Sequence, residues 1–302
     1  METLLTRTLL LLMRLMAWLP LPLVHGLGWL LGWLRYLTSP QHAKLLRENL
    51  ENSGVCPDAA TLRQTRRKAI GESGKVLLES LAIWQRDEST LLSWVHSLDG
   101  WGVVEEALAE GKGIIFLTPH LGCYEITSIF YGSQRPITVL YRAPKQKWLL
   151  PLIVAGRTRG QATLAVAKLH GVRELLRTLR QKHAIGILPD QIPAKGEGEW
   201  APFFGRPAYT MTLASRLAEK TGAPVIMVFS ERLSWGRGFR IHFNRLPQGA
   251  INSVEGLNAA IEAQVRQCPA QYLWSYHRYK IRRRAKPLDS PEADAEGFDD
   301  PE

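Results

Sequence analysis

The chain has 302 residues and a formal net charge of +10, with seven acids among its last fourteen residues. Without that tail the chain carries +17, which favours an anionic partner such as phosphate-bearing lipid, a membrane surface or an acidic carrier protein. The basic residues form no recognisable nucleic-acid-binding motif, so we expect no nucleic acid partner. Three cysteines without a Cys-x-x-Cys pair argue against a disulfide framework or a zinc site.

The N-terminal segment, residues 8–34, is strongly apolar but is interrupted by an arginine, two prolines and a histidine. Residues 8–19 alone, as a helix, are too short to cross about 30 Å of hydrocarbon. The whole segment could span with a proline kink, lie in the membrane interface as two short helices, or act as a secretory signal peptide, although no Ala-x-Ala-like site follows. We favour an uncleaved membrane anchor over residues 1–37, and if it spans, the following basic residues place the body in the cytoplasm.

The next predicted element is a long helix over residues 58–85, where apolar side chains recur at roughly helical spacing. Beyond it, short apolar runs alternate with longer amphipathic runs. Strands are expected at 113–117, 137–141, 162–167, 184–188, 225–230 and 239–243. Helices are expected at 147–157, 172–182, 210–220 and 254–267. This alternation predicts an α/β fold with helices on both faces of the sheet and a site at the carboxyl ends of its strands. His120, Arg142 and Asp190 each follow an expected strand, so one crevice could hold all three.

The segment Thr118-Pro119-His120-Leu121-Gly122-Cys123-Tyr124-Glu125 follows the first predicted strand. His120 therefore lies where a strand ends and a helix could begin. An imidazole can take a proton from an attacking hydroxyl near neutral pH when a carboxylate holds its tautomer, and Glu125 is close enough in sequence to do so. On spacing alone, a capping or core-edge histidine is the more common alternative. Cys123 is a conceivable nucleophile, but a small buried side chain is the preferred interpretation.

The same segment resembles the His-x4-Asp/Glu signature of the bacterial lipid A biosynthesis acyltransferases, the late lauroyl and myristoyl transferases related to glycerolipid acyltransferases. Cys123 and Tyr124 depart from it, because they stand where that family usually has Asn and Trp. The resemblance covers most of residues 10–284. Its further motifs are Leu188-Pro189-Asp190-Gln191, residues 200–208, residues 221–225 and residues 272–280.

This resemblance implies an α/β fold with a glycerolipid-acyltransferase-like mixed sheet flanked by helices, behind the N-terminal apolar membrane-anchoring segment. The catalytic domain would cover residues 38–286, and the acidic tail over residues 287–302 is expected to be disordered. The implied reaction moves a fatty acyl chain from acyl carrier protein to a hydroxyl of a lipid A precursor, at the cytoplasmic face of the inner membrane. His120 and Glu125 would be the catalytic pair, and membrane lipids would be further partners.

The developing oxyanion of such a reaction needs hydrogen-bond donors, for which backbone N–H groups beside Gly122 or a nearby arginine are candidates. An arginine could also hold lipid phosphates, although each one alone is more often an ordinary surface residue. The resemblance favours the third and fourth of four arginines: Arg142, Arg157, Arg159 and Arg173. Asp190 and Gln191 match the family's Pro-Asp-Gln segment and are candidate substrate-binding residues, but Asp190 could equally cap a turn and shape the pocket.

The sequence contains no motif that is typical of another enzyme chemistry. A Gly-x-Ser-x-Gly elbow, a His-Glu-x-x-His pair and a phosphate-binding loop are all missing from the sequence, so we expect no metal and no cofactor. The basic and aromatic residues from Trp274 to Lys286 suit a membrane surface or acyl carrier protein, or are simply a solvated helix face. Two alternatives remain: acyl transfer to a lysophospholipid or another lipid hydroxyl, with acyl-CoA as a conceivable donor, and a noncatalytic membrane-binding protein.

Overall fold

A computed structural model describes residues 4–144 and 147–280. The helices are α1 (Leu4–Trp18), α2 (Leu21–Thr38), α3 (Pro40–Glu51), α4 (Ala59–Gln85), α5 (Glu88–Ser93), α6 (Trp101–Ala109), α7 (Tyr124–Gly132), α8 (Leu150–Arg157), α9 (Leu169–Arg180), α10 (Leu213–Thr221) and α11 (Val254–Gln267). The strands are β1 (Val95–Asp99), β2 (Ile114–Leu117), β3 (Ile137–Tyr141), β4 (Ala162–Val166), β5 (Ala184–Ile187), β6 (Gly198–Phe203), β7 (Arg206–Met211), β8 (Val225–Arg232) and β9 (Phe239–Arg245). The predicted acidic tail lies outside the described residues.

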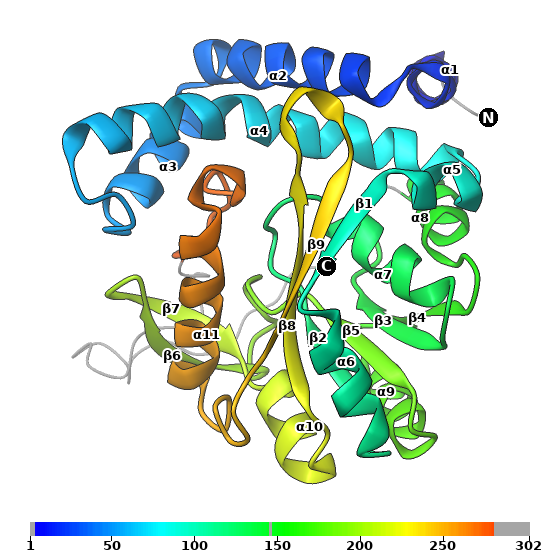
Figure 1. The fold of residues 1–302 in the computed structure, drawn as a ribbon. Coiled ribbons are helices and arrows are strands. Elements are labelled where there is room, and N and C mark those ends of the chain that lie inside the picture. The colour runs from blue at the N-terminus through cyan, green and yellow to red at the C-terminus, as the bar shows by residue number, and fades with distance from the viewer. Residues whose placement is uncertain (1–3, 145–146, 281–302) are drawn as a thin grey trace, which may run out of the picture.

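Seven strands form one mixed sheet in the order β1-β9-β8-β2-β5-β3-β4, and β6 and β7 form a separate antiparallel hairpin. Within the large sheet only the pair β8 and β9 is antiparallel, so β1 and β9 run against the other five strands. Helices pack on this sheet, as Figure 1 shows. The predicted mixed α/β sheet flanked by helices is confirmed.

Strand β2 explains why both faces of the sheet are covered. Its side chains alternate, and all four are buried. Ile115 and Leu117 belong to a core that includes α9, α10 and α11, whereas Ile114 and Phe116 belong to a second core that includes α6 and Tyr131 of α7. A strand buried on both faces has no polar face to present to water, which is why it appears in the sequence as an unbroken apolar run.

The six predicted strands are all present, each within two residues of its predicted ends. The long helix begins where expected, because the Asp58 side chain accepts hydrogen bonds from the backbone N–H groups of Ala60 and Thr61. The helix predicted at 210–220 starts too early, since its first residues complete β7. Strands β1, β6 and β7 were not predicted. Each keeps several exposed or half-buried residues and therefore lacks a continuous apolar run.

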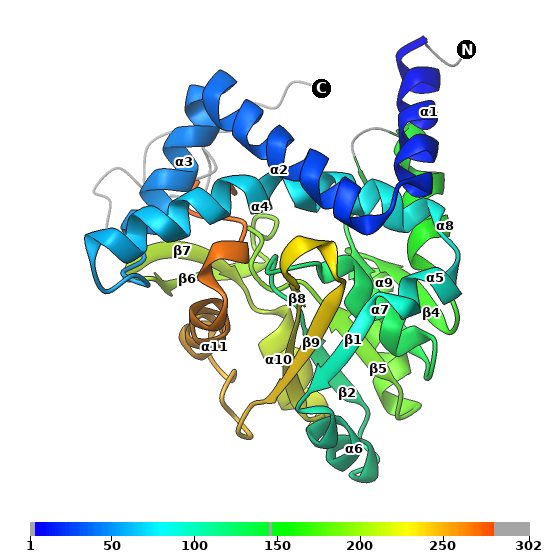
Figure 2. The same cartoon turned by 45° about the horizontal axis from the view of Figure 1, so that its top comes forward.

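The N-terminal apolar segment forms two helices that break at Pro20, and α2 lies alongside α4 above the sheet (Figures 1 and 2). Glycines let the two backbones approach closely. A Cβ atom on Gly74 would lie only 2.1 Å from the carbonyl oxygen of Gly28 and 2.3 Å from the amide nitrogen of Gly32. Within residues 4–144 and 147–280, no helix combines the length and the apolar character that crossing a membrane requires. The membrane anchor therefore stays a prediction.

Candidate active site

The centre of the candidate site is formed by two neighbouring parallel strands. Leu117 of β2 pairs in register with Ile187 of β5, and His120 and Asp190 each follow three residues later. The backbone N–H of Thr118 also donates to the carbonyl oxygen of Ile187 at 2.9 Å. Because parallel strands end at the same edge of a sheet, the topology brings together two segments that lie 70 residues apart in the chain.

Asp190 holds His120 by two hydrogen bonds. The ring Nδ1–H of His120 donates to Oδ1 of Asp190 at 2.8 Å, and its backbone N–H donates to Oδ2 at 2.8 Å. This contact fixes the tautomer that leaves Nε2 as the hydrogen-bond acceptor. The side-chain amide of Gln191 lies 3.0 Å from Nε2 and donates to it. His120 is thus oriented as a base whose accepting nitrogen faces an amide that a substrate could displace.

The charge of Asp190 is supported by the same contacts. Asp190 is 2% exposed, and burial by itself would raise its pKa. The imidazole of His120, together with the hydrogen bonds from its ring and backbone, outweighs that effect and lowers the pKa below its ordinary value. Asp190 therefore stays ionised at neutral pH, where it can stabilise an imidazolium on His120.

Glu125, the predicted partner of His120, is paired elsewhere. Its carboxylate accepts two hydrogen bonds from the guanidinium of Arg157, one of them 2.8 Å long from Nε. No hydrogen bond joins Glu125 to His120; Asp190 occupies the position that the sequence analysis gave to Glu125. The physical reason is the turn between them. Gly122 has a φ of +62°, so His120 and Glu125 do not lie on one helix, and Glu125 is in the first turn of α7, where it pairs with Arg157.

Two tyrosines surround the imidazole. The ring of Tyr124 lies 4.8 Å from the ring of His120, and the ring of Tyr276 lies nearly parallel to it at 6.5 Å. The hydroxyl of Tyr276 accepts a hydrogen bond from the backbone N–H of Ile192 at 3.0 Å. Residues from three of the motifs that carry the family resemblance therefore meet around His120, which the sequence could place only in separate segments.

The two arginines that the resemblance favours, Arg159 and Arg173, form no hydrogen bond with the imidazole of His120. Arg159 donates to carbonyl oxygens at the end of α4, among them those of Ile83 and Trp84, and so caps that helix. Arg173 is exposed on α9, and Arg142 is exposed after β3; neither forms a hydrogen bond or ion pair with His120 or Asp190. Arg157, which the sequence analysis named but ranked lower, is the one of these four arginines that pairs with Glu125 in the described part of the chain.

Two further expectations concern the turn beside Gly122. The N–H groups of Gly122 and Cys123 donate to the carbonyl oxygens of Gln271 and Ser230 at 3.1 and 2.8 Å, so they are already occupied and are not free oxyanion donors. The thiol of Cys123 is 1% exposed, and burial raises its pKa well above the ordinary value. A buried thiol of raised pKa is a poor nucleophile, which agrees with the preferred interpretation of Cys123 as a small buried side chain.

The predicted basic surface near the C-terminus is also revised by the structure. Arg278 is 3% exposed, and its guanidinium donates to the carbonyl oxygen of Tyr209 and the hydroxyl of Thr210. It is therefore a core residue that joins the chain end to β7. The basic residues from 282 onward lie outside the described residues.

A small cavity lies on the α7 side of the sheet, and one of its lining residues is Tyr124, whose ring is 4.8 Å from that of His120. Thr118 and Leu188 line it at the carboxyl ends of β2 and β5. Phe116 and Gly186, two residues earlier in the same strands, line it as well. Tyr131 of α7 completes this wall, with its ring 4.8 Å from that of Phe116. The cavity is mostly apolar, but its volume is only about 30 Å³, so an acyl chain would fit only if its walls moved apart.

The sequence as a whole matches the family model described as bacterial lipid A biosynthesis acyltransferase over residues 2–281. The chain belongs to this family. It is 24% identical to the lipid A biosynthesis lauroyltransferase of Escherichia coli (strain K12) over 282 residues, which are 89% of each chain. It is also 24% identical to the lipid A biosynthesis palmitoleoyltransferase of the same organism over 273 residues, 87% of each chain. A lipid A biosynthesis acyltransferase of Haemophilus influenzae is 26% identical over 192 residues, 61% of this chain and 59% of that protein.

The family membership agrees with the resemblance found in the sequence and makes the chain an acyltransferase. Family membership does not by itself assign the acyl donor, the acceptor hydroxyl or the role of each residue. Sequence reasoning placed His120, Arg142 and Asp190 each after a predicted strand, where one crevice could hold all three, but it gave Glu125 as the carboxylate partner of His120. What the sequence lacked is the register of the two strands: Leu117 of β2 pairs with Ile187 of β5, so His120 and Asp190 each follow the last strand residue by three positions.

Proposed function

We propose that this acyltransferase moves a fatty acyl chain from acyl carrier protein to a hydroxyl of a lipid A precursor, with His120 as the general base. The single observation that supports this mechanism best is the two-point contact of Asp190 with His120, which presents Nε2 as an acceptor. Family membership supports lipid A as the class of acceptor.

In the proposed reaction, the acceptor hydroxyl displaces the amide of Gln191 and donates its hydrogen bond to Nε2 of His120. As its oxygen attacks the thioester carbonyl, the proton passes to Nε2 and Asp190 stabilises the imidazolium. When the tetrahedral intermediate collapses, the carbon–sulfur bond breaks and the imidazolium returns the proton to the thiolate. No covalent enzyme intermediate is needed, which is consistent with the inert environment of Cys123.

We propose that Glu125 contributes through Arg157 instead of contacting His120. Glu125 is 3% exposed, and its charge is balanced by the Arg157 guanidinium, whose side chain remains 21% exposed. A guanidinium held in one orientation at the edge of a site is suited to bind a phosphate or a developing oxyanion. Both residues thus keep a role in the site, with the contact to substrate assigned to Arg157.

The acyl chain is proposed to enter the apolar cavity near His120 as its walls move apart, since the volume of about 30 Å³ is too small for the chain. Its apolar walls at Phe116, Leu188 and Tyr131 would exclude water from methylene groups, each of which gains about 0.8 kcal/mol on burial. Because Tyr124 lines the cavity and its ring lies 4.8 Å from the ring of His120, we expect an acyl chain there to have its carbonyl end toward the imidazole.

We also propose that the protein docks on the cytoplasmic face of the inner membrane through the outer face of α2. Five leucines line that face at helical spacing, each between 42% and 75% exposed: Leu23, Leu27, Leu30, Leu34 and Leu37. Trp235, 89% exposed at the tip of the β8–β9 hairpin, adds to this surface, because the neighbouring Gly236 packs against Pro22 at the start of α2. A helix with one apolar outer face is suited to lie in a lipid interface.

The test is acyl transfer in detergent with purified wild-type protein, offering acyl carrier protein or CoA as donor and a tetraacylated lipid A precursor or a lysophospholipid as acceptor. We expect product from the acyl carrier protein donor and the lipid A precursor, and a loss of about 10³-fold in His120→Ala. His170→Ala, which changes an exposed histidine on α9, is the control and should keep its activity.

Each outcome separates one alternative. Product only with the lysophospholipid would replace the proposed acceptor, and product only with acyl-CoA would replace the proposed donor. Full activity in His120→Ala would remove the general-base mechanism. If no donor and acceptor give product while the protein binds lipid vesicles equally well with and without His120, a noncatalytic membrane-binding role would replace the proposal.

A further inference from the structure

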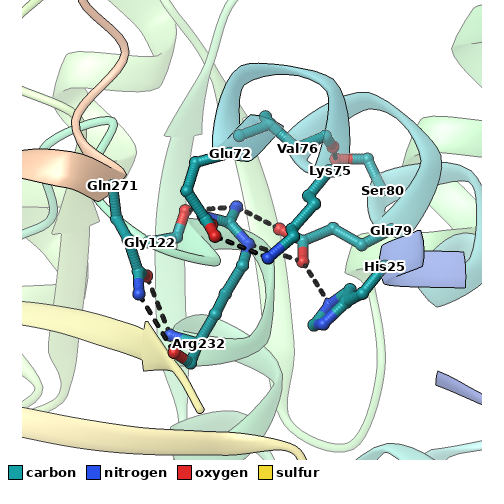
Figure 3. A network of polar contacts seen from close by, with 9 residues as sticks. All are labelled: His25, Glu72, Lys75, Val76, Glu79, Ser80, Gly122, Arg232 and Gln271. Carbon is teal, nitrogen blue, oxygen red and sulfur yellow. Dashed lines mark hydrogen bonds and ion pairs between the residues drawn. The ribbon is translucent and has the colours of Figure 1, made fainter. Parts of the chain in front are cut away.

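A second buried cluster of charged side chains lies where β8 meets α4, and Figure 3 shows its arrangement. At its centre, the Arg232 side chain at the end of β8 is 1% exposed. Its Nε donates to Oε2 of Glu79 at 2.8 Å, and a second nitrogen donates to the other oxygen of that carboxylate. Glu72 accepts a further contact from Arg232 at 3.3 Å, and His25 of α2 lies 3.1 Å from Glu79.

The cluster also contacts the turn that follows His120. The Arg232 nitrogen that donates to Oε1 of Glu79 also donates to the carbonyl oxygen of Gly122, at 2.8 Å. The Gln271 side chain exchanges two hydrogen bonds with the backbone of Arg232, at 2.8 and 3.0 Å, and the backbone carbonyl of Gln271 accepts from the N–H of Gly122. The N–H and the carbonyl oxygen of Gly122 are therefore both held, the first by the backbone of Gln271 and the second by the side chain of Arg232.

The turn itself allows little adjustment. At Gly122 the φ is +62°, and a Cβ atom there would lie 2.0 Å from the carbonyl oxygen of Ser230. That same carbonyl oxygen accepts from the N–H of Cys123 at 2.8 Å. The backbone carbonyl of His120 accepts in turn from the N–H of Leu273 at 3.0 Å. A shift of the Arg232 guanidinium would therefore displace the peptide two residues after His120 within a closely packed turn.

Stability alone is a weak explanation for this cluster. Removing charged groups from water costs several kcal/mol per ion, and apolar side chains of similar volume often serve the folded state as well or better. Burial by itself would raise the pKa of Glu79, but Arg232 and His25 lower it to about 2, so the pair stays charged near neutrality. A fixed guanidinium, unlike an apolar side chain, can hold a carbonyl oxygen in one place.

We propose that Arg232 is a positioning residue for the catalytic turn: it holds the carbonyl oxygen of Gly122, with Glu79 fixing its guanidinium and His25 joining that carboxylate to α2. The proposal rests on the function of His120 proposed above. It connects α2, at the surface of the protein, to the turn that carries the imidazole through three side chains.

The test compares kinetic constants and thermal unfolding of the full-length protein in detergent. Arg232→Lys keeps the charge but loses the planar fork, and we expect kcat to fall about 10²-fold with KM changed less than about threefold, as for a misplaced catalytic group. Glu79→Asp, which keeps the charge and shortens its reach, should lower kcat about tenfold, and His25→Phe about threefold, in the order of their distance from the turn.

The control is Asn258→Ala. Asn258 is fully buried and hydrogen-bonded to the Pro202 carbonyl oxygen and the Thr210 hydroxyl, within another polar cluster. It should lower the melting temperature as much as the Arg232 variant while leaving kcat within about twofold, because it removes buried hydrogen bonds without touching the turn.

Three results would overturn the proposal: wild-type kcat in folded Arg232→Lys, a kcat loss in all variants that simply follows the loss of melting temperature, or a change confined to KM. If Arg232→Lys does not fold, Glu79→Asp decides by the same criteria. Failure of the proposed function looks different, because then wild type itself would be inactive or His120→Ala would keep its activity.

Discussion

Two buried clusters of charged residues approach the same turn, residues 120–123, and they differ in how completely they are neutralised. In the cluster around Arg232, two carboxylates share one guanidinium, and the Glu72 carboxylate also contacts the ammonium of Lys75. In the cluster around His120, one carboxylate holds Nδ1 of the imidazole, and Nε2 on the other side contacts the amide of Gln191. We call the first cluster closed because its charged groups pair with one another, although Nδ1 of His25 has no hydrogen-bond partner among the described residues. The second cluster is open, because a substrate can take the position of the amide.

This difference shows how a buried charge becomes a catalytic group. A carboxylate that is matched by a guanidinium has no unmet interaction and therefore fixes the backbone around it. An imidazole oriented on one side and weakly partnered on the other is positioned and yet able to accept a proton. Glu125 and Asp190 illustrate the same contrast, since Glu125 is matched by Arg157 and Asp190 by an imidazole that can change its charge.

The largest expected effect separates these two carboxylates. Asp190→Asn should lower kcat about 10³-fold, because an amide no longer selects the productive tautomer or stabilises the imidazolium. Glu125→Gln should lower kcat less and raise KM, because it loosens Arg157 and leaves His120 in place. Steady-state kinetics of both variants, with unfolding curves to verify the fold, check this. A larger kcat loss in Glu125→Gln would restore the pair expected from the sequence.

The closed cluster should appear in the pH dependence of stability. The pKa of Glu79 is lowered from 4.5 to about 2 in the folded protein, so its contribution is complete above pH 4.5 and is lost as the pH falls through about 2. This corresponds to about 3 kcal/mol of unfolding free energy. Denaturant unfolding between pH 2 and pH 7 should show a steeper acid loss in wild type than in Glu79→Gln. Parallel curves would mean that the Glu79 charge is not stabilised by the fold.

The seating of α2 on α4 should matter next. Gly74→Ala places a methyl group against the backbone of α2, and we expect it to lower the unfolding free energy by about 1–3 kcal/mol despite the better helix propensity of alanine. Gly26→Ala is the matched control, since nothing lies within 4 Å of its Cβ position, and it should be neutral or slightly stabilising. Equal melting temperatures for the two variants would contradict the close packing.

The smallest effect is expected at the wall of the apolar cavity near His120. Gly186→Ala adds one methyl group to this wall, 3.3 Å from a methyl group of Val139. Preference among acyl donors should move toward shorter chains by about fivefold, which corresponds to about 1 kcal/mol, the lower end of what one methylene is worth. Competition between donors of two chain lengths measures this shift directly. An unchanged product ratio would place the acyl chain elsewhere.

The secondary structure elements and the contiguous motifs of the chain could be predicted from its sequence. Unbroken apolar runs identified the strands that lie inside the sheet, and helical periodicity identified α4. The strand β1 was missed because it lies at the edge of the sheet, where exposed side chains remove the apolar signal. The family resemblance, carried by motifs spread over most of the chain, was recognisable for the same reason: each motif is contiguous.

The partners of each charged group were decided only by the tertiary structure. The sequence alone determined that His120 follows a buried strand and that acids and arginines lie in nearby motifs. It could not determine that Asp190 meets His120 while Glu125 meets Arg157, because strand order and the positive φ of Gly122 set those distances. Hydrogen bonds act over about 3 Å, so pairing depends on where the folded backbone brings two side chains, and spacing along the chain does not fix it.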